Sequence, residues 1–393
     1  PDASVSVKVF PSSKSPATRL AGDLTGDGVS TLGLAEESAI KNVEVWLFVG
    51  ETPDGYKKGE VGEAFVEGVP TTAGDKTMVV AANANIGEVA NKTELLGKFA
   101  AALSQDLTNG LVMTSVPVDI ELIGGKNQYG YKTTDTDDAL SLYDSEANQI
   151  SAGTRLSITR INARIALVGL EYEFTSPFYN KFELTEVALF NARKASNYFG
   201  SPLYKGNDFL YGSAYPSTLS TYVGSASYAG AFNAAVDTTL AQSFEANTEL
   251  TAPALVNAKN AHYFYAFENS KNTFVTVDEK QVDNKEGTFI VLKGKLYKDA
   301  TQYFAPGLET DADGYTYYAI WVNDPNSNYT DETYVADGTI KRNTQYNISA
   351  KLYKAGNPTI DPPVEAQLDV WVEVAPWIVV GQDVEWGTPP ANP

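Results

Sequence analysis

Apolar side chains recur at every second position in short runs along the whole chain, and the first run places Val5, Val7 and Val9 on one face. A period of two is that of a half-buried β-strand. The 31 glycines and 19 prolines spread between the runs supply turns, while the 23 tyrosines and 17 phenylalanines favour strands. Because 393 residues exceed the usual size of one hydrophobic core, we expect a mainly β protein with two domains.

Two segments add detail to this expectation. Residues 43–49 alternate at first and are then wholly apolar, which predicts a strand in the middle of a sheet. Residues 91–107 instead show helical spacing from Leu95 to Leu103, with Thr93 as a candidate N-cap, and they predict one clear helix in the N-terminal domain. The sequence changes from loop-rich to strand-rich at Arg155, so we expect the two domains at residues 20–154 and 155–393.

The N-terminal strand is followed by a segment suited to cleavage. Residues 11–19 hold two prolines, three serines and no apolar residue larger than alanine, which predicts an exposed linker. Arg19 is the only arginine before Arg155. An arginine-specific protease cutting between Arg19 and Leu20 would therefore release residues 1–19, which are one strand with its linker, and little else.

The C-terminal segment, residues 364–386, is the most strongly patterned part of the chain. Pro376 divides it, because proline has no N–H to offer a β-ladder. Prolines also precede it, so a pair of strands there could detach and pair elsewhere without disturbing the rest of the fold. The apolar residues of this expected donor segment are Leu368, Val370, Val372, Val374, Ile378, Val380 and Trp386.

Composition excludes several kinds of chemistry. Without cysteine the chain has no disulfide, no thiolate metal site and no thiol nucleophile. His262 is the single histidine, lies in an expected strand and has no partnered nucleophile, so we interpret it as an ordinary strand residue. A formal net charge of −20 argues against nucleic acid as a partner. We expect a protein that is not an enzyme and that holds no cofactor or metal.

One stretch tests the expectation of no metal. Residues 23–28, from Asp23 through Asp27, resemble the opening of a calcium-binding loop, but Leu34 stands where the loop needs a bidentate glutamate. We therefore do not expect calcium there. Carboxylate pairs of the glycosidase kind need a geometry that a sequence does not supply.

Several stretches, taken in order, resemble one family: the type V pilins, the fimbrillin-like subunits of Bacteroidales surface fimbriae. The match runs along nearly the whole chain. The stretches that carry it are NVEVWLF (42–48), VVAANAN (79–85), RLSITRINARI (155–165), YFYAFEN (263–269), KRNTQYNI (341–348) and the terminal segment 377–386.

This resemblance implies two transthyretin-like β-sandwich domains. It implies export as a lipoprotein precursor, lipid-anchored to the outer membrane, and assembly into a fimbrium at the cell surface. Cleavage by an arginine- or lysine-specific protease would fall between Arg19 and Leu20 and release the strand that carries Val5, Val7 and Val9. A strand from residues 364–386 of another copy, or of a related pilus subunit, would then fill the vacated groove.

A second hypothesis is a fimbrial tip or accessory adhesin that binds carbohydrate or protein on a host surface. It rests on six tyrosines in a loop-like stretch, whose rings could stack on sugars. Aromatic side chains anchor long loops as readily as they bind ligands, so packing of the loop is the competing interpretation. The six are Tyr198, Tyr204, Tyr211, Tyr215, Tyr222 and Tyr228.

Overall fold

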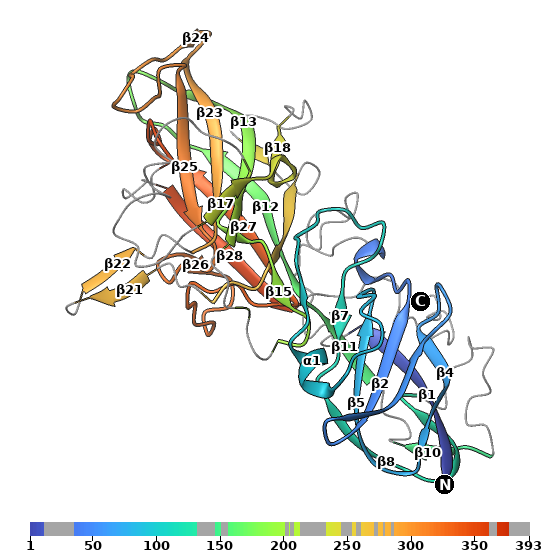
Figure 1. Ribbon diagram of the computed structural model, residues 1–393. Coiled ribbons are helices and arrows are strands. Elements are labelled where there is room, and N and C mark those ends of the chain that lie inside the picture. Colours follow the sequence, from blue (N-terminus) through green and yellow to red (C-terminus); the bar gives the residue numbers. More distant parts are fainter. Residues whose placement is uncertain are drawn as a thin grey trace, which may run out of the picture.

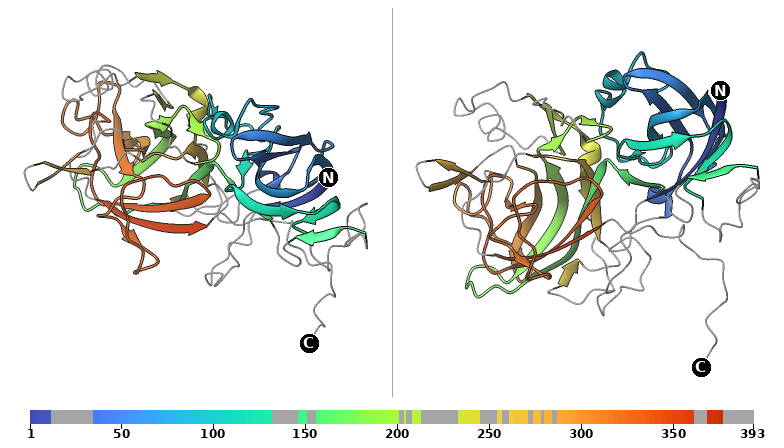
Figure 2. Two further views of the ribbon diagram at one scale, coloured as in Figure 1. Left: turned by 60° about the horizontal axis from the view of Figure 1, so that its bottom comes forward. Right: turned by 90° about the horizontal axis from the view of Figure 1, so that it is seen from below.

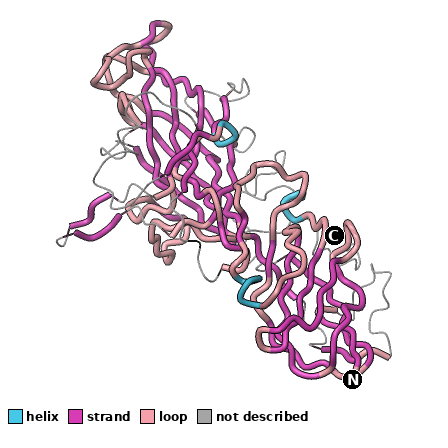
Figure 3. The backbone as a smooth tube through the Cα atoms, in the orientation of Figure 1, coloured by secondary structure: helices cyan, strands magenta, loops and turns pink. Residues whose placement is uncertain are grey.

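The structure is a computed structural model and is dominated by β-strands (Figure 3). It describes residues 1–11, 35–131, 146–150, 156–200, 204, 208–212, 233–244, 254–256, 261–270, 274–277, 280–283, 287–360 and 368–376. Two domains lie side by side, and the chain begins at the far end of the first (Figures 1 and 2). The mainly β, two-domain architecture expected from the sequence is confirmed.

Ten strands form the hydrogen-bonded sheet of the N-terminal domain, in the order β10-β9-β1-β11-β7-β5-β2-β3, with β4 paired to β1 and β8 to β5. The sheet closes around one core, to which β1, β4 and β9 contribute from one layer and β2, β5 and β8 from the other. The ten strands are β1 (Asp2–Pro11), β2 (Val43–Val49), β3 (Thr52–Lys58), β4 (Phe65–Thr72), β5 (Gly74–Ala82), β7 (Met113–Thr114), β8 (Val118–Leu122), β9 (Gly125–Tyr129), β10 (Asn148–Ile150) and β11 (Leu156–Arg160). The short strand β6 (Phe99–Ala100) lies outside this sheet.

The two main sheets of the C-terminal domain have six and five strands. One has the order β19-β12-β27-β28-β26 with β20 on β12, and the other β18-β13-β23-β24 with β25 on β23; they enclose the larger core of the molecule. The long strands are β12 (Asn162–Tyr172), β13 (Lys181–Phe190), β20 (His262–Phe267), β23 (Phe289–Lys298), β25 (Tyr315–Trp321), β27 (Thr344–Leu352) and β28 (Leu368–Pro376).

Short elements fill the remaining described parts of this domain. They are β14 (Ala192–Arg193), β15 (Ser196–Asn197), β16 (Asp208–Tyr211), β17 (Asn233–Val236), β18 (Ala241–Ser243), β19 (Ala254–Val256), β21 (Phe274–Val277), β22 (Lys280–Asp283), β24 (Thr301–Gln302) and β26 (Asn328–Tyr329). Two 3₁₀ turns complete the molecule, η1 (Ala35–Ser38) before β2 and η2 (Thr238–Leu240) before β18. Within the described residues, no helix is both long and apolar enough to cross a membrane.

The predicted helix is present but shorter than expected. It is α1 (Lys92–Leu96), on the N-terminal domain (Figure 1). Asn91, not Thr93, is its N-cap, because the Asn91 side chain accepts a hydrogen bond from the Glu94 N–H at 2.7 Å.

The expected continuation of this helix to residue 107 is wrong. Gly97 ends the helix, and Phe99–Ala100 then pairs as β6 with β15. The apolar residues that suggested one continuous stripe belong to two separate cores: Leu95 packs in a cluster on the N-terminal domain, whereas Leu103 packs in the core of the C-terminal domain. Helical spacing alone does not show that residues share one surface.

The chain passes from the first domain to the second between Arg160 and Asn162. β11 (Leu156–Arg160) pairs with β1 and β7, both in the N-terminal sheet, and β12 (Asn162–Tyr172) opens the C-terminal sheet. The expected boundary at Arg155 thus precedes the last strand of the first domain. The apolar pattern of β11 would look the same whether the strand belonged to the N-terminal or the C-terminal sheet. The pattern therefore does not show to which domain the strand belongs.

Candidate functional site

β1 is hydrogen-bonded along both of its edges. One edge pairs antiparallel with β4, from Asp2 opposite Thr72 to Lys8 opposite Phe65. The other edge pairs parallel with β9 over residues 3–7 and with β11 over residues 9–11. We call this position, between β4 on one edge and β9 and β11 on the other, the β1 slot. Removal of β1 would leave N–H and C=O groups unpaired on both sides.

One face of β1 forms part of the hydrophobic core. Val5, Val7 and Val9 are each 0% exposed and pack in the same cluster as Val66 and Val69 of β4. The three valines are therefore on one buried face, as their spacing predicts. An empty slot would expose an apolar floor beside two unpaired strand edges, which is a strongly adhesive surface.

The ladder between β1 and β4 contains a β-bulge. Val5 lies opposite Val69 and Val7 opposite Val66, so β4 has one extra residue there. Gly68 adopts a φ of +57° at the bulge, and its N–H donates to the Ser6 hydroxyl at 3.0 Å. A strand in the slot must therefore bring a hydrogen-bond acceptor to the position of Ser6 or leave this N–H unsatisfied.

A second glycine lets β1 pass closely beside the end of β9. Gly130 has a φ of +85°, and a Cβ built there would lie 2.2 Å from the Lys8 carbonyl oxygen. Only glycine fits this position. Neither Gly68 nor Gly130 is predicted from the sequence. The available signal was a glycine inside an apolar strand pattern for Gly68 and a glycine between two tyrosines, Tyr129 and Tyr131, for Gly130.

The β4 wall of the slot is fastened to its neighbours through Asp54 on β3. The Asp54 carboxylate accepts hydrogen bonds from the Thr71 hydroxyl (2.5 Å) and the Thr72 N–H (3.0 Å), and Lys76 Nζ lies 3.3 Å away. Burial disfavours the charged carboxylate, but these donors outweigh it and lower the pKa of Asp54 to about 2. The carboxylate is therefore ionised at neutral pH and links β3, β4 and β5.

The expected donor segment lies partly within its own domain. β28 pairs antiparallel with β27 along its whole length, from Leu368 opposite Leu352 to Pro376 opposite Thr344. On its other edge, the two residues of β26 are the only described ones that pair with it. Val372 is 0% exposed and joins the C-terminal core, and Val370 packs against that core partly buried.

The other predicted residues of the donor segment and the cleavage position cannot be placed. Ile378, Val380 and Trp386 lie outside the described residues, as do Arg19 and Leu20. The backbone of Val374 lies in β28 beside Tyr346 of β27. The described part of the expected donor segment is therefore a strand seated in its own sheet.

The tyrosines behind the adhesin hypothesis pack on their own chain where the structure describes them. Tyr204 lies 5.3 Å from the Phe99 ring and Tyr211 lies 6.1 Å from Phe190, measured between ring centroids. Tyr198 contacts Phe199 edge-on. Tyr215, Tyr222 and Tyr228 lie outside the described residues. For the described tyrosines the structure favours packing of the loop.

The remaining candidates do not form a catalytic or metal-binding site within the described part of the chain. His262 lies on β20 and contacts the Phe244 ring, with its Nε2 3.4 Å from the Ser243 carbonyl oxygen. A search of the described residues finds no group of three His, Asp or Glu side chains able to hold a metal ion. The Asp23 to Asp27 stretch lies outside them.

The structure has two sandwich domains. β1 is seated in the N-terminal sheet between β4 on one edge and β9 and β11 on the other, and β28 ends at Pro376. This combination defines a protein of the fimbrillin class. The family model of the major fimbrial subunit protein FimA matches residues 3–160, and that of the FimA4 pilin C-terminal domain matches residues 160–377. The chain belongs to this family of FimA-type fimbrial subunits. The two matches meet at residue 160, where the chain leaves β11.

Individual relatives agree with this assignment. The chain is 31% identical over 373 residues to the major fimbrium subunit FimA type-3 of Porphyromonas gingivalis, covering 89% of this chain and 87% of the relative. It is 28% identical to a FimA type-2 subunit of the same organism, with the same coverage.

Solved structures give the same result. A fimbrilin (FimA) from P. gingivalis W83 superposes with a TM-score of 0.71 at 25% identity, covering 97% of this chain and 99% of that one. A putative cell adhesion protein from Parabacteroides distasonis shares the fold, with a TM-score of 0.66 at 19% identity and coverage of 96% and 99%.

Proposed function

We propose that this protein is a structural subunit of a cell-surface fimbrium and that it polymerises by strand exchange through the β1 slot. The observation that carries the proposal is β1 itself: a ten-residue strand ahead of the cleavage position, paired on both edges, with three fully buried valines. Membership of a family of fimbrial subunits supports it. The precursor would be held at the outer membrane by a lipid anchor until it is processed.

The first step is loss of β1. Cleavage between Arg19 and Leu20 would leave β1 held only by non-covalent contacts. Burial of its three valines stabilises the seated strand by about 5–9 kcal/mol in gross terms, at ~1.5–3 kcal/mol for each side chain. An incoming strand that offers the same burial and the same edges can replace it by β-augmentation.

The second step is donation of a strand by another copy. Release of β28 would strip β27 of a nine-residue partner and open the C-terminal core at Val372. We therefore assign donation to the residues that follow Pro376, with Ile378, Val380 and Trp386 entering the slot while β28 keeps the donor anchored. Seventeen residues follow Pro376 (377–393), enough to reach roughly 55 Å when extended.

The contact formed in this way joins different surfaces of identical molecules. The donor lies at the C-terminal end of one copy, and the slot lies in the N-terminal domain of the next. Such heterologous contacts build filaments unless the rotation between copies closes a ring. The partners are therefore other copies of this chain or related pilus subunits, together with the processing protease.

Protease treatment tests the proposal directly. The purified chain is incubated with an arginine-specific protease and examined by mass spectrometry for loss of residues 1–19, then by electrophoresis for SDS-resistant ladders. Arg19→Gln should abolish both cleavage and ladders, while the matched control Lys14→Gln should preserve both. A chain that lacks residues 377–393 should be cleaved without forming ladders. Ladders from the Arg19→Gln variant, or cleavage without assembly at high concentration, would contradict the proposal.

A further inference from the structure

β11 forms one wall of the β1 slot and has few partners of its own. Leu156, Ser157 and Ile158 pair with β1, while only Thr159 and Arg160 pair with β7. Among the described strands, the first three residues have no ladder partner other than β1. Loss of β1 would therefore leave more than half of this wall without a neighbouring strand.

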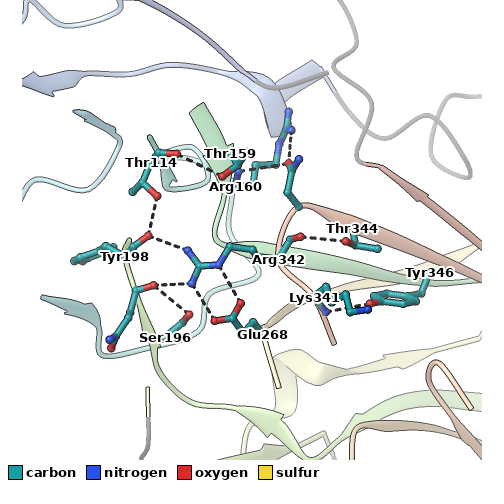
Figure 4. Close-up of polar contacts among 12 residues, drawn as sticks. Thr114, Thr159, Arg160, Ser196, Tyr198, Glu268, Lys341, Arg342, Thr344 and Tyr346 are labelled. Carbon is teal, nitrogen blue, oxygen red and sulfur yellow. Dashed lines mark hydrogen bonds and ion pairs between the residues drawn. The ribbon is translucent and has the colours of Figure 1, made fainter. Parts of the chain in front are cut away.

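The last residue of β11 is held by its side chain. Arg160, labelled in Figure 4, is 0% exposed. Its Nε donates to the Glu37 carbonyl oxygen at 3.0 Å, and its two terminal nitrogens donate to the Ser38 hydroxyl at 2.8 Å and to Asn343 Oδ1 at 3.3 Å. The guanidinium thus joins β11 to η1 and to the loop before β27, neither of which includes β1.

The acceptors of Arg160 are themselves fixed to the second domain. Asn343 has a φ of +53°, and its N–H donates to the Asn162 carbonyl oxygen at 2.8 Å. Glu37 is 1% exposed; its carboxylate accepts from the Tyr265 hydroxyl at 2.6 Å and lies 3.4 Å from Arg164 Nε. η1 is therefore anchored to β12 and β20, so Arg160 anchors β11 to the C-terminal domain.

A neighbouring arginine provides the contrast. Arg342 precedes Asn343 and donates to the carbonyl oxygens of Asn197 (2.9 Å) and Tyr198 (3.0 Å) and to the Glu268 carboxylate (3.1 Å). These contacts also join the two domains, because β15 pairs with β6. None of them ends on β11 itself, although the Tyr198 carbonyl oxygen also accepts from the Thr114 hydroxyl at 2.8 Å and Thr114 pairs with Thr159 of β11 (Figure 4).

We propose that Arg160 is a positioning residue that holds β11 in place while the β1 slot is empty, so that the slot stays open for an incoming strand. This role rests on the proposed strand exchange. It explains what keeps the slot open after β1 has left and before a strand from another copy enters. While β1 is seated, β11 is held by both β1 and Arg160. Once β1 has left, the anchor to the C-terminal domain carries this role.

The test measures re-entry of a strand into the empty slot. Wild type, Arg160→Met and Arg342→Met are cleaved after β1, either at Arg19 or at the recognition sequence of an unrelated site-specific protease placed within residues 13–18. A labelled peptide of residues 1–11 is added in excess, and bound label is measured after gel filtration. We expect wild type and Arg342→Met to bind the peptide alike and Arg160→Met to bind at least ten-fold less.

Each outcome decides the proposal. Equal binding by all three proteins overturns the role of Arg160 and leaves strand exchange intact. Wild type that binds no peptide, although mass spectrometry shows that residues 1–19 have left, shows that the empty slot does not persist, and this also overturns the role of Arg160. SDS-resistant ladders in the same sample would show that strand exchange itself survives. Equal loss of binding in Arg160→Met and Arg342→Met would indicate a general need for a joined pair of domains and would also overturn it.

Two further measurements separate positioning from stability. The uncleaved variants are compared with wild type by near-UV circular dichroism and thermal unfolding, and Arg160→Met should keep a cooperative transition because β1 still holds β11. If Arg160→Met does not fold, Arg160→Lys takes its place: it keeps the charge but cannot reach three acceptors, and it should bind less peptide than wild type.

Hydrogen exchange of residues 156–160 should rise in Arg160→Met much more after cleavage than before it. A rise of the same size in both forms would contradict the proposal.

Discussion

Substitution of Val7 should destabilise the uncleaved monomer and leave the stability of the filament unchanged. Val7 is at the centre of β1 and 0% exposed, in the core shared with β4. Val7→Ala removes two methyl groups from a packed site. At ~0.8 kcal/mol for each group plus a contribution from the cavity left behind, the uncleaved chain should lose about 2 kcal/mol of stability. This corresponds to a roughly 30-fold change in the unfolding equilibrium constant of the N-terminal domain.

The assay is urea unfolding of the uncleaved monomer, followed by tryptophan fluorescence. The transition midpoint should fall while the slope with denaturant stays the same, because the surface exposed on unfolding is nearly unchanged. Ser4→Ala is the matched control, since Ser4 lies on the other face of the same strand and is only partly buried. It should change the stability by less than about 0.5 kcal/mol.

The same substitution should have no effect on the filament. If β1 leaves and a strand from another copy replaces it, Val7 is absent from the assembled form, and ladders from Val7→Ala should dissociate at the same temperature as wild-type ladders. Assembly after cleavage should be faster, because the released strand is held less tightly. Filaments weakened by Val7→Ala would mean that β1 remains in place, and an unchanged monomer would mean that β1 is not part of the core; either result would contradict exchange of β1 for another strand.

Three further predictions concern the walls of the slot and the donor. Gly130→Ala should destabilise the uncleaved chain by more than 2 kcal/mol, measured by urea unfolding, because a Cβ there meets the Lys8 carbonyl oxygen and the backbone φ is positive. The lowered pKa of Asp54, about 2 against an ordinary 3.8, means that its contribution is complete above the ordinary value and is lost as pH falls towards 2. Asp54→Asn should therefore lower the free energy of unfolding by about 1–2 kcal/mol at neutral pH, after allowance for solvent screening. It should also flatten the dependence of this free energy on pH between 2 and 5. An unaltered pH dependence would show that the carboxylate does not link β3 to β4. Deletion of 377–393 should leave the thermal midpoint of the uncleaved chain within a few degrees of wild type, whereas deletion from Leu368 onward should lower it sharply, because only the second removes β28 from its sheet.

The sequence predicts best where a local pattern and the tertiary fold agree. Val5, Val7 and Val9 alternate, and the strand that contains them is buried on that face. The strand at residues 43–49 was expected in the middle of a sheet, and β2 lies between β5 and β3. The alternation of β1 reflects one core, whereas β2 is apolar on both faces because Val43, Val45 and Leu47 pack in the core shared with β1 and Trp46 and Phe48 pack in a second cluster.

Prediction fails where residues close in sequence serve different partners. Leu95 and Leu103 have helical spacing yet pack in different cores. Glu37 has the character of a surface residue, but contacts more than a hundred residues away bury it beside Arg160 and Tyr265. No local pattern encodes such pairings, because they depend on how the two domains meet.

The neighbours of β1 run in opposite directions, and this bears on how a guest strand would be oriented in the slot. β4 is antiparallel to β1, whereas β9 and β11 are parallel to it. A guest strand therefore meets one parallel and one antiparallel neighbour whichever way it enters, and backbone hydrogen bonding favours neither orientation strongly. The choice falls to side chains: where the apolar residues of the guest meet the floor, and which atom reaches the Gly68 N–H. The direction of a guest strand within the slot would thus depend on a few side-chain positions, and a small number of substitutions in the guest segment could reverse its insertion without altering either domain.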